Sequence, residues 1–118
     1  MTAVLPVSRA CLESAPLWEH CRNSLGIARL LVHEGRPDAF VATACRMALE
    51  NGCRAALEQA GMPFDGNLEE SLRRLCLEDV DAGETVASGA VRLAAAERTL
   101  SRIAVYLRSL VPERTWGL

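Results

Sequence analysis

The stretch DAFVATACRMALENGCRAALEQA, residues 38–60, carries the pattern on which the fold depends. Its apolar residues recur with the period of an α-helix, and no strict alternation of apolar and polar residues indicates a strand. Small residues, mostly alanine, recur along it, and small side chains let neighbouring helices approach closely. Pro37 presets φ for a helix start, and Gly61 occupies the position of a C-cap glycine. We therefore expect 38–60 to be the central helix of an all-α protein.

A second long helix is expected before this one. Ser14 is its expected N-cap, Pro16 lies in the first turn, where proline is tolerated, and the helix runs to about Glu34 and stops at Gly35. Residues 8–13 are expected to form a separate short helical turn. The apolar stripe of the long helix comprises Trp18, Cys21, Leu25, Ala28 and Val32, flanked by Ile27 and Leu31.

Two more helices are expected after the central one. Asn67 and Glu70 form a variant of the capping box, so a short third helix should begin there and end near Cys76. The last helix is expected over about 85–110, where apolar residues repeat every seven positions, as in the seam of a helical bundle. The repeating residues are Val86, Leu93, Leu100 and Leu107, with Ala90, Ile103 and Leu110 filling the stripe. The sequence thus predicts an up-and-down helical bundle of about four helices.

Length and composition favour a single cytoplasmic domain. The 118 residues suit one domain, 1–118, with 1–13 and 112–118 as loosely attached ends, although Trp116 leaves docking of the second end open. The formal net charge is -2, so no global field attracts nucleic acid or a membrane. No apolar run reaches the roughly 20 residues of a membrane span, and residues 1–6 do not resemble a signal peptide. The 5 cysteines include no C-x-x-C pair, and we expect them to be reduced and mostly buried.

Few residues point to a particular chemistry. His20 and His33 are too far apart on one helix to share a metal ion. Gly35 ends the helix just after His33, and the chain has no lysine, which disfavours a histidine phosphotransfer domain. The acidic segment from Asp79 lacks the glycine and glutamate positions of a calcium loop, and phosphate-binding loops and serine elbows are absent. We therefore predict no catalytic residue, no metal and no cofactor.

Charged residues on the central helix form a regular ladder. Arg46, Glu50, Arg54 and Glu58 are spaced by four with alternating sign, which places them along one face. This spacing favours a solvated helix face stabilised by ion pairs over a binding surface.

A second set of charges lies on the last helix. Arg98 and Arg102 share a face, where they could contact phosphate or form ion pairs with Glu69 or Glu70. The structural interpretation is favoured, and because no aromatic residues interleave with these arginines, a base-stacking surface is not indicated.

Half of the chain resembles the HEPN family of small helical bundles. The segment SLGIARLLVHEGRPDA, residues 24–39, looks like the family's first helix and the link that follows it. The segments ACRMALE, residues 44–50, and RAALEQAG, residues 54–61, are similar to its second helix, and residues 67–75 lie where its third helix begins. The resemblance implies a helical bundle that forms a homodimer.

The resemblance also bears on activity. Many HEPN proteins are RNases that carry an arginine, four to six residues and then a histidine near the last main helix. Here no histidine follows His33, and Arg29 is separated from His33 by only three residues on a different helix. The resemblance then implies a non-catalytic binding or regulatory module, which pairs with a small nucleotidyltransferase or binds a small ligand. Glu50 and Arg54 match the polar positions of the family pattern.

Two alternatives stay open. The first is a degenerate RNA-cleaving or RNA-binding HEPN protein in which Arg98 and Arg102 grip phosphate. The second is a helical protein of structural or regulatory role whose resemblance to the family is coincidental.

Overall fold

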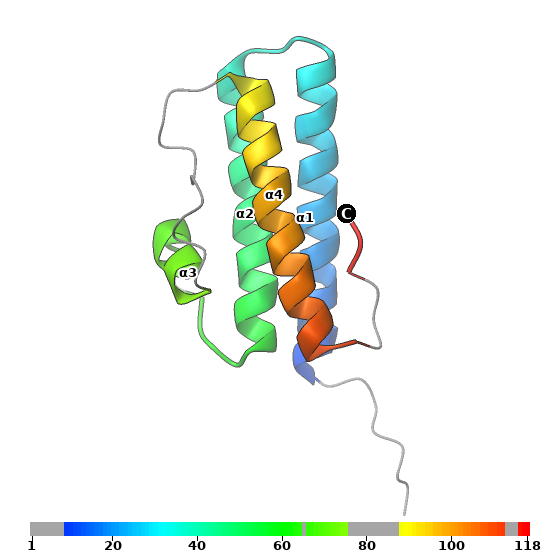
Figure 1. Ribbon diagram of the computed structural model, residues 1–118, viewed down its shortest axis with the longest axis vertical. Helices are drawn as coiled ribbons and strands as arrows, with labels where there is room; N and C mark the ends of the chain where they lie inside the picture. The colour runs from blue at the N-terminus through cyan, green and yellow to red at the C-terminus, as the bar shows by residue number, and fades with distance from the viewer. Residues whose placement is uncertain (1–8, 65, 76–87, 113–115) are drawn as a thin grey trace, which may run out of the picture.

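The computed structural model describes residues 9–64, 66–75, 88–112 and 116–118, with the backbone alone for 9–14. These residues form four helices and no strand: α1 (Arg9–His33), α2 (Asp38–Gln59), α3 (Leu68–Arg74) and α4 (Gly89–Leu110). The helices α1 and α2 form an antiparallel hairpin, α4 lies across it, and α3 packs beside α2 (Figure 1). The prediction of an all-α helical bundle is confirmed.

The first helix is longer than the sequence suggested. It runs without a break from Arg9 to His33 and contains Pro16 in its interior. The prediction of a separate turn over 8–13 with an N-cap at Ser14 is therefore wrong. A proline removes one backbone donor from a helix and crowds the preceding turn, but it does not oblige the helix to begin there.

Glycines end α1 and α2, as predicted. Gly35 has φ 68° and Gly61 has φ 76°, in the left-handed region that glycine adopts without a steric penalty. At the end of α1 the N–H of Arg36 donates to the carbonyl of Leu31 at 2.9 Å, which is the 6→1 hydrogen bond of a Schellman motif. The tight link that follows folds α2 back along α1.

The second helix is central, as its small residues predicted. It packs against each of the other three helices. Gly52 shows how close the approach is, because a Cβ added there would lie 2.7 Å from Cδ2 of Leu100 on α4. The buried residues of α2 are Val41, Ala44, Cys45, Ala48, Leu49, Gly52, Cys53, Ala55, Ala56 and Leu57.

The short third helix begins as predicted. The side chain of Asn67 accepts a hydrogen bond from the N–H of Glu70 at 2.9 Å, so Asn67 is its N-cap. The helix ends at Arg74, and the expected end near Cys76 lies outside the described residues. A hydrogen bond from Arg73 lowers the pKa of the Glu70 carboxyl group. Leu68 and Leu72, on the face toward α2, are buried.

The last helix begins later than the predicted residue 85. Ser88 is extended and serves as the N-cap, since its hydroxyl accepts a hydrogen bond from the N–H of Val91 at 3.3 Å. Serine competes well for this role because its side chain satisfies a backbone donor that the helix itself leaves unpaired. Leu100 and Leu107 of the predicted seam are buried, whereas Val86 lies outside the described residues.

Residues 116–118 dock on the bundle. Trp116 is buried, its ring meets that of Trp18 edge to face with centroids 6.0 Å apart, and its indole N–H donates to the Val111 carbonyl at 3.1 Å. The indole N–H of Trp18 in turn donates to the carbonyl of Gly117 at 3.0 Å. The sequence left the docking of Trp116 open, and residues 116–118 are attached to the bundle here, where two indoles each gain a buried edge and a hydrogen bond.

Candidate functional site

An apolar groove runs between α1 and α2, with a volume of about 440 Å³. Three of the large side chains along it are half exposed or more: Ile27 (54%), Phe40 (58%) and Met47 (50%). Its lining has no charged side chain and consists of Ser24, Ile27, Leu31, Phe40, Thr43, Ala44 and Met47. We call this set the apolar groove.

The groove lies on the side of the hairpin that α4 leaves open. Arg29 lies on the side of α1 that faces α4, because its guanidinium forms an ion pair with Glu97 of α4 at 2.7 Å. Ile27 and Leu31 are each two positions from Arg29, and two positions correspond to about 200° around a helix. None of the lining residues comes from α4. The hairpin therefore has one face packed against α4 and one apolar face exposed.

The local sequence explains this exposed face. On α2, Phe40 and Met47 are seven residues apart, so they lie on one side of the helix, two turns from each other. They are offset from the buried stripe that includes Val41 and Ala48. The helix thus carries two apolar stripes, of which α1 and α4 cover one.

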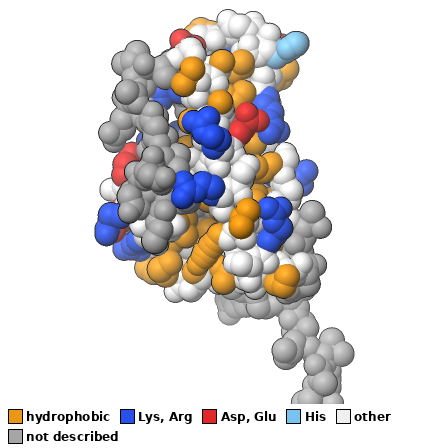
Figure 2. Space-filling model, viewed as in Figure 1, with side chains coloured by type: hydrophobic (Ala, Val, Ile, Leu, Met, Phe, Trp, Pro, Cys, Tyr) orange, Lys and Arg blue, Asp and Glu red, His pale blue; other side chains and the backbone are white. Residues whose placement is uncertain are grey.

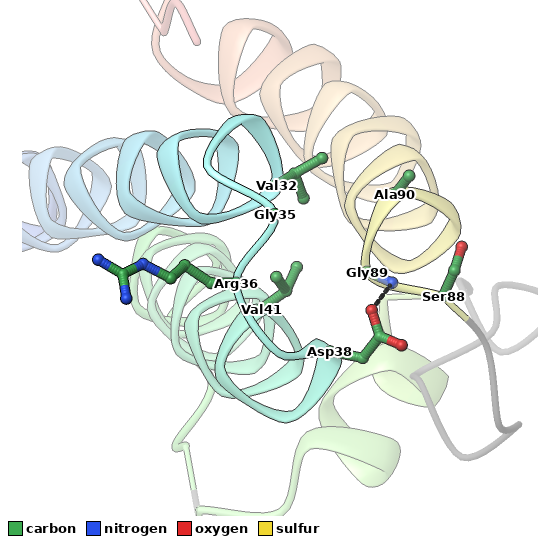
Figure 3. A pocket seen from close by; sticks show the side chains of 8 residues that line it. All are labelled: Val32, Gly35, Arg36, Asp38, Val41, Ser88, Gly89 and Ala90. Carbon is green, nitrogen blue, oxygen red and sulfur yellow. Dashed lines mark hydrogen bonds between the residues drawn. The ribbon is translucent and has the colours of Figure 1, made fainter.

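A second, smaller hollow lies where the α1–α2 link meets the start of α4, with a volume of about 260 Å³. Here the carboxylate of Asp38 accepts a hydrogen bond from the N–H of Gly89 at 2.7 Å (Figure 3). The Arg36 side chain extends away from the hollow and forms an ion pair with Glu34 at 3.4 Å (Figure 3). Asp38 therefore connects the start of α4 to the start of α2.

The predicted residues Glu50 and Arg54 belong to ion pairs on the surface of α2. Glu50 pairs with Arg46 at 3.1 Å, and Arg54 pairs with Glu58 at 3.3 Å, as the spacing of four predicted. The guanidinium of Arg54 also lies over the ring of Phe64, 6.0 Å from its centroid. Neither Glu50 nor Arg54 lines the apolar groove.

The predicted residues Arg98 and Arg102 are both exposed on α4. The glutamates expected to pair with them have other partners: Glu69 pairs with Arg46 at 3.4 Å, and Glu70 with arginines of its own helix. The expected pairing does not form because α3 packs beside α2 and not α4.

The histidines are not gathered into a site. His20 and His33 are both exposed on α1. Within the described part of the chain, no three side chains of histidine, cysteine, aspartate or glutamate are grouped so that they could hold a metal ion.

Three cysteines are buried in the core, as predicted: Cys21, Cys45 and Cys53. Burial raises the pKa of Cys21 and of Cys53 to about 12, so both thiols stay protonated at neutral pH. The thiolate is the reactive form, and these two side chains therefore act as small apolar groups. The side chains of Cys11 and Cys76 lie outside the described residues.

The apolar groove was not identified from the sequence, although Ile27 and Leu31 were placed beside the buried stripe of α1. The available signal was the pair Phe40 and Met47, two large apolar residues among the small ones of α2. Periodicity identifies apolar stripes, but it does not say which of them a neighbouring helix will cover.

Comparisons with protein-family models, with curated proteins and with solved structures find no match for this chain. Among the described residues, the helices also lack the combination of length and apolar character that crossing a membrane requires.

Proposed function

We propose that the protein is a non-catalytic, HEPN-like binding or regulatory module that forms a homodimer through the apolar groove. The observation that carries the proposal is the exposure of Ile27, Phe40 and Met47 together on one uncharged face of the α1–α2 hairpin. Contiguous apolar surface of this kind marks interaction sites on soluble proteins.

A second copy of the chain is the occupant that this face fits. In a two-fold dimer each face meets its own copy, so a charged residue near the axis would meet the same charge. The lining of the groove carries no charge. Its two hydroxyl residues, Ser24 and Thr43, can act as hydrogen-bond donors or acceptors on either copy of the chain. The face also has a protruding ring, Phe40, beside small residues such as Ala44, so protrusion and hollow are present on the same surface.

The available area is close to what a stable dimer needs. The 22 residues of α2 extend about 33 Å, and two adjacent helices present a face about 20 Å wide. The whole length of this face, of which the apolar groove covers the part at residues 40–47 of α2, offers about 650 Å² per copy, below the roughly 800 Å² of a standard interface. Two hairpins packed face to face would form a four-helix bundle, which is a common way to bury two such stripes.

The end of this face beyond Met47 is polar. Arg54 lies seven residues after Met47 and therefore on the same side of α2, with Glu50 one turn before it. Both belong to ion pairs, which suits the rim of an interface, where charges remain solvated. We assign Glu50 and Arg54 to the rim of the dimer contact, and the dimer is the unit that would bind a small nucleotidyltransferase or a small ligand.

Self-association is tested by native mass spectrometry and sedimentation over a range of concentrations. The wild-type chain is expected to be a dimer, and Phe40→Glu and Met47→Glu are expected to weaken it at least about 100-fold, since each would bury an unpaired carboxylate. Val105→Glu is the matched control, because Val105 on α4 is exposed to the same 58% as Phe40. A wild-type monomer at every concentration, or an equal effect of the control, would overturn the proposal.

The proposal that the protein is non-catalytic can be tested separately. It is supported by the lack of any histidine after His33 and by the protonated, buried thiols of Cys21 and Cys53. Purified protein is expected to leave single-stranded RNA intact at varied pH and with varied divalent metals. RNA cleavage that disappears in Arg98→Ala would instead favour a degenerate nuclease.

A further inference from the structure

One hydroxyl group at the apolar groove has no partner. Ser24 is only 7% exposed, yet its side chain forms no hydrogen bond within the described part of the chain. The other buried hydroxyl residues, Ser71 and Thr99, each donate to the carbonyl four residues before them, at 2.8 and 3.0 Å. Thr43, the second hydroxyl residue of the groove, does the same at 3.0 Å. Buried polar groups are normally paired, so the free hydroxyl of Ser24 needs an explanation.

The Ser24 hydroxyl opens onto the groove. Ser24 belongs to the lining, on the same side of α1 as Ile27 and Leu31, which follow it by three and seven residues. The hydroxyl is not sealed inside the protein, because among the described residues the fully enclosed side-chain atom without a partner is Oε1 of Gln59. A molecule in the groove can therefore reach the hydroxyl of Ser24 and form a hydrogen bond with it.

The groove has the length of a short aliphatic chain. Leu31 and Phe40 lie near the link between α1 and α2, whereas Ser24 and Met47 each lie seven residues further from that link. Seven residues of helix extend about 10 Å. Carbon–carbon bonds are about 1.5 Å long, so an extended chain of about eight carbon atoms spans this distance. The volume of about 440 Å³ is also within the range of small-molecule sites.

The lining of the groove disfavours a charged ligand. None of its side chains is charged, so an ionised group beside Ser24 would lose hydration without gaining a counter-ion. The face that carries α4 differs, since arginine side chains lie among apolar ones there (Figure 2). The groove therefore suits a neutral, apolar molecule with one hydrogen-bonding oxygen.

We propose that the apolar groove binds a neutral aliphatic molecule of about eight carbon atoms that ends in one oxygen, such as a primary alcohol. Its chain lies along Ile27, Leu31 and Ala44, which supply apolar contacts. Its terminal oxygen shares a hydrogen bond with the Ser24 hydroxyl, which can both donate and accept. This ligand gives the one unpaired hydroxyl of the groove its partner.

In one respect the inference rests on the proposed dimer. A chain lying in an open groove keeps one side in water, whereas small-molecule sites bury most of the ligand surface. In the proposed dimer the second copy would cover the open side. Because each event then favours the other, ligand binding should strengthen dimerisation by the same factor by which dimerisation strengthens ligand binding.

The test titrates the full chain with 1-octanol, octanoate or 1-butanol and follows its methyl groups by NMR. The titrations are run at pH 8, where imidazole side chains are ordinarily uncharged. With 1-octanol the methyl signals of Ile27, Leu31 and Met47 are expected to shift, whereas those of Val105, which is as exposed on α4 as Ile27 is on α1, are not.

The three probes separate charge from chain length. Octanoate is expected to bind at least about tenfold more weakly than 1-octanol, because it brings an unpaired charge to the lining. The affinity of 1-butanol is expected to be lower by at least about tenfold, because it buries half as many carbon atoms.

Two hydroxyl variants assign the polar contact. Ser24→Ala removes the unpaired hydroxyl and is expected to weaken 1-octanol binding by about 3- to 10-fold, as the loss of one hydrogen bond does. Thr43→Val is the matched control, because its hydroxyl already donates to the Ala39 carbonyl, and it is expected to change the affinity by less than about twofold. Sedimentation of the wild-type chain is expected to show a tighter dimer with 1-octanol than without it.

Failure of the ligand site and failure of the dimer give different results. A dimer in which 1-octanol shifts no groove methyl, or shifts Val105 as much as Ile27, would refute the ligand site alone. Equal effects of Ser24→Ala and Thr43→Val would refute the hydrogen bond to Ser24. A monomer that binds 1-octanol with dependence on Ser24 would support the ligand site and refute the dimer. A dimer that 1-octanol dissociates would show that the second copy does not cover the ligand.

Discussion

Replacing Gly52 by alanine should reveal how closely α2 and α4 pack. The new Cβ would lie 2.7 Å from Cδ2 of Leu100, 3.4 Å from Sγ of Cys21 and 3.6 Å from Cζ3 of Trp18. Extra atoms in a packed core cost about 1–3 kcal/mol, whereas replacing glycine by alanine inside a helix gains about 1 kcal/mol. We therefore expect the free energy of unfolding to fall by about 1 kcal/mol, within a range of roughly 0–2 kcal/mol.

Gly26 provides the matched control for this substitution. It is exposed in the interior of α1, and a Cβ added there would have no neighbouring atom within 4 Å. Gly26→Ala therefore gains the helical preference of alanine without any crowding and should stabilise the protein by about 0.5–1 kcal/mol. Urea unfolding followed by far-ultraviolet circular dichroism measures both variants under the same conditions.

The contrast between the two glycines decides the outcome. If Gly52→Ala stabilises the protein as much as Gly26→Ala does, the result would contradict the close packing of Leu100 against α2. Shortening Leu100 to valine gives an internal check, because it should cost less in the Gly52→Ala background than in the wild type. A double-mutant cycle that shows no such coupling would also contradict the packing.

Two other contacts and the ionisation of two buried thiols can also be tested by unfolding measurements. Asp38→Ala removes the carboxylate that accepts the first N–H of α4 and should lower the free energy of unfolding by about 1 kcal/mol, unlike Asp38→Asn, which keeps an acceptor oxygen. Trp116→Phe keeps an aromatic ring but loses the hydrogen bond to the Val111 carbonyl, so thermal unfolding should occur a few degrees lower, by about 1 kcal/mol of stability; an unchanged melting temperature would mean that this bond contributes nothing. Cys21 and Cys53 have folded pKa values of about 12 against an ordinary 9.0, so their contribution is complete below pH 9.0 and is lost as the pH rises toward 12. In that window stability should fall by about 1.4 kcal/mol per pH unit for each thiol, and a slope that persists unchanged in Cys53→Ala would contradict the assignment.

Helix ends were the most predictable part of the fold. Gly35, Gly61 and Asn67 act locally, through their own backbone freedom or side chain, so the sequence specifies the termini without knowledge of the packing. The starts of α1 and α4 were predicted incorrectly, because of Pro16 and Ser88. A proline is compatible with both a first turn and a helix interior, and Ser88 lies inside a stretch whose apolar repeat continues on both sides of it.

Tertiary contacts explain what could not be predicted. Trp116 is separated from Trp18 by nearly the whole chain, and no periodicity links an isolated tryptophan to a distant helix. The exposure of Phe40 and Met47 is equally a result of the direction from which α4 approaches α2. The ladder of Arg46 and Glu50 was predictable because both partners lie on one helix.

The pairing of Trp18 with residues near Gly117 has a consequence for the kinetics of folding. The hydrogen bond between Trp18 and Gly117 joins positions 99 residues apart, so it closes a loop that contains the later part of α1 and all of α2, α3 and α4. Closing so long a loop is entropically costly until the intervening helices have assembled, so this contact should form after the rate-limiting step. A contact absent from the transition state affects the rate of unfolding far more than the rate of folding. The contacts of the tryptophan pair should therefore slow unfolding, and so lengthen the lifetime of the native state, without speeding folding.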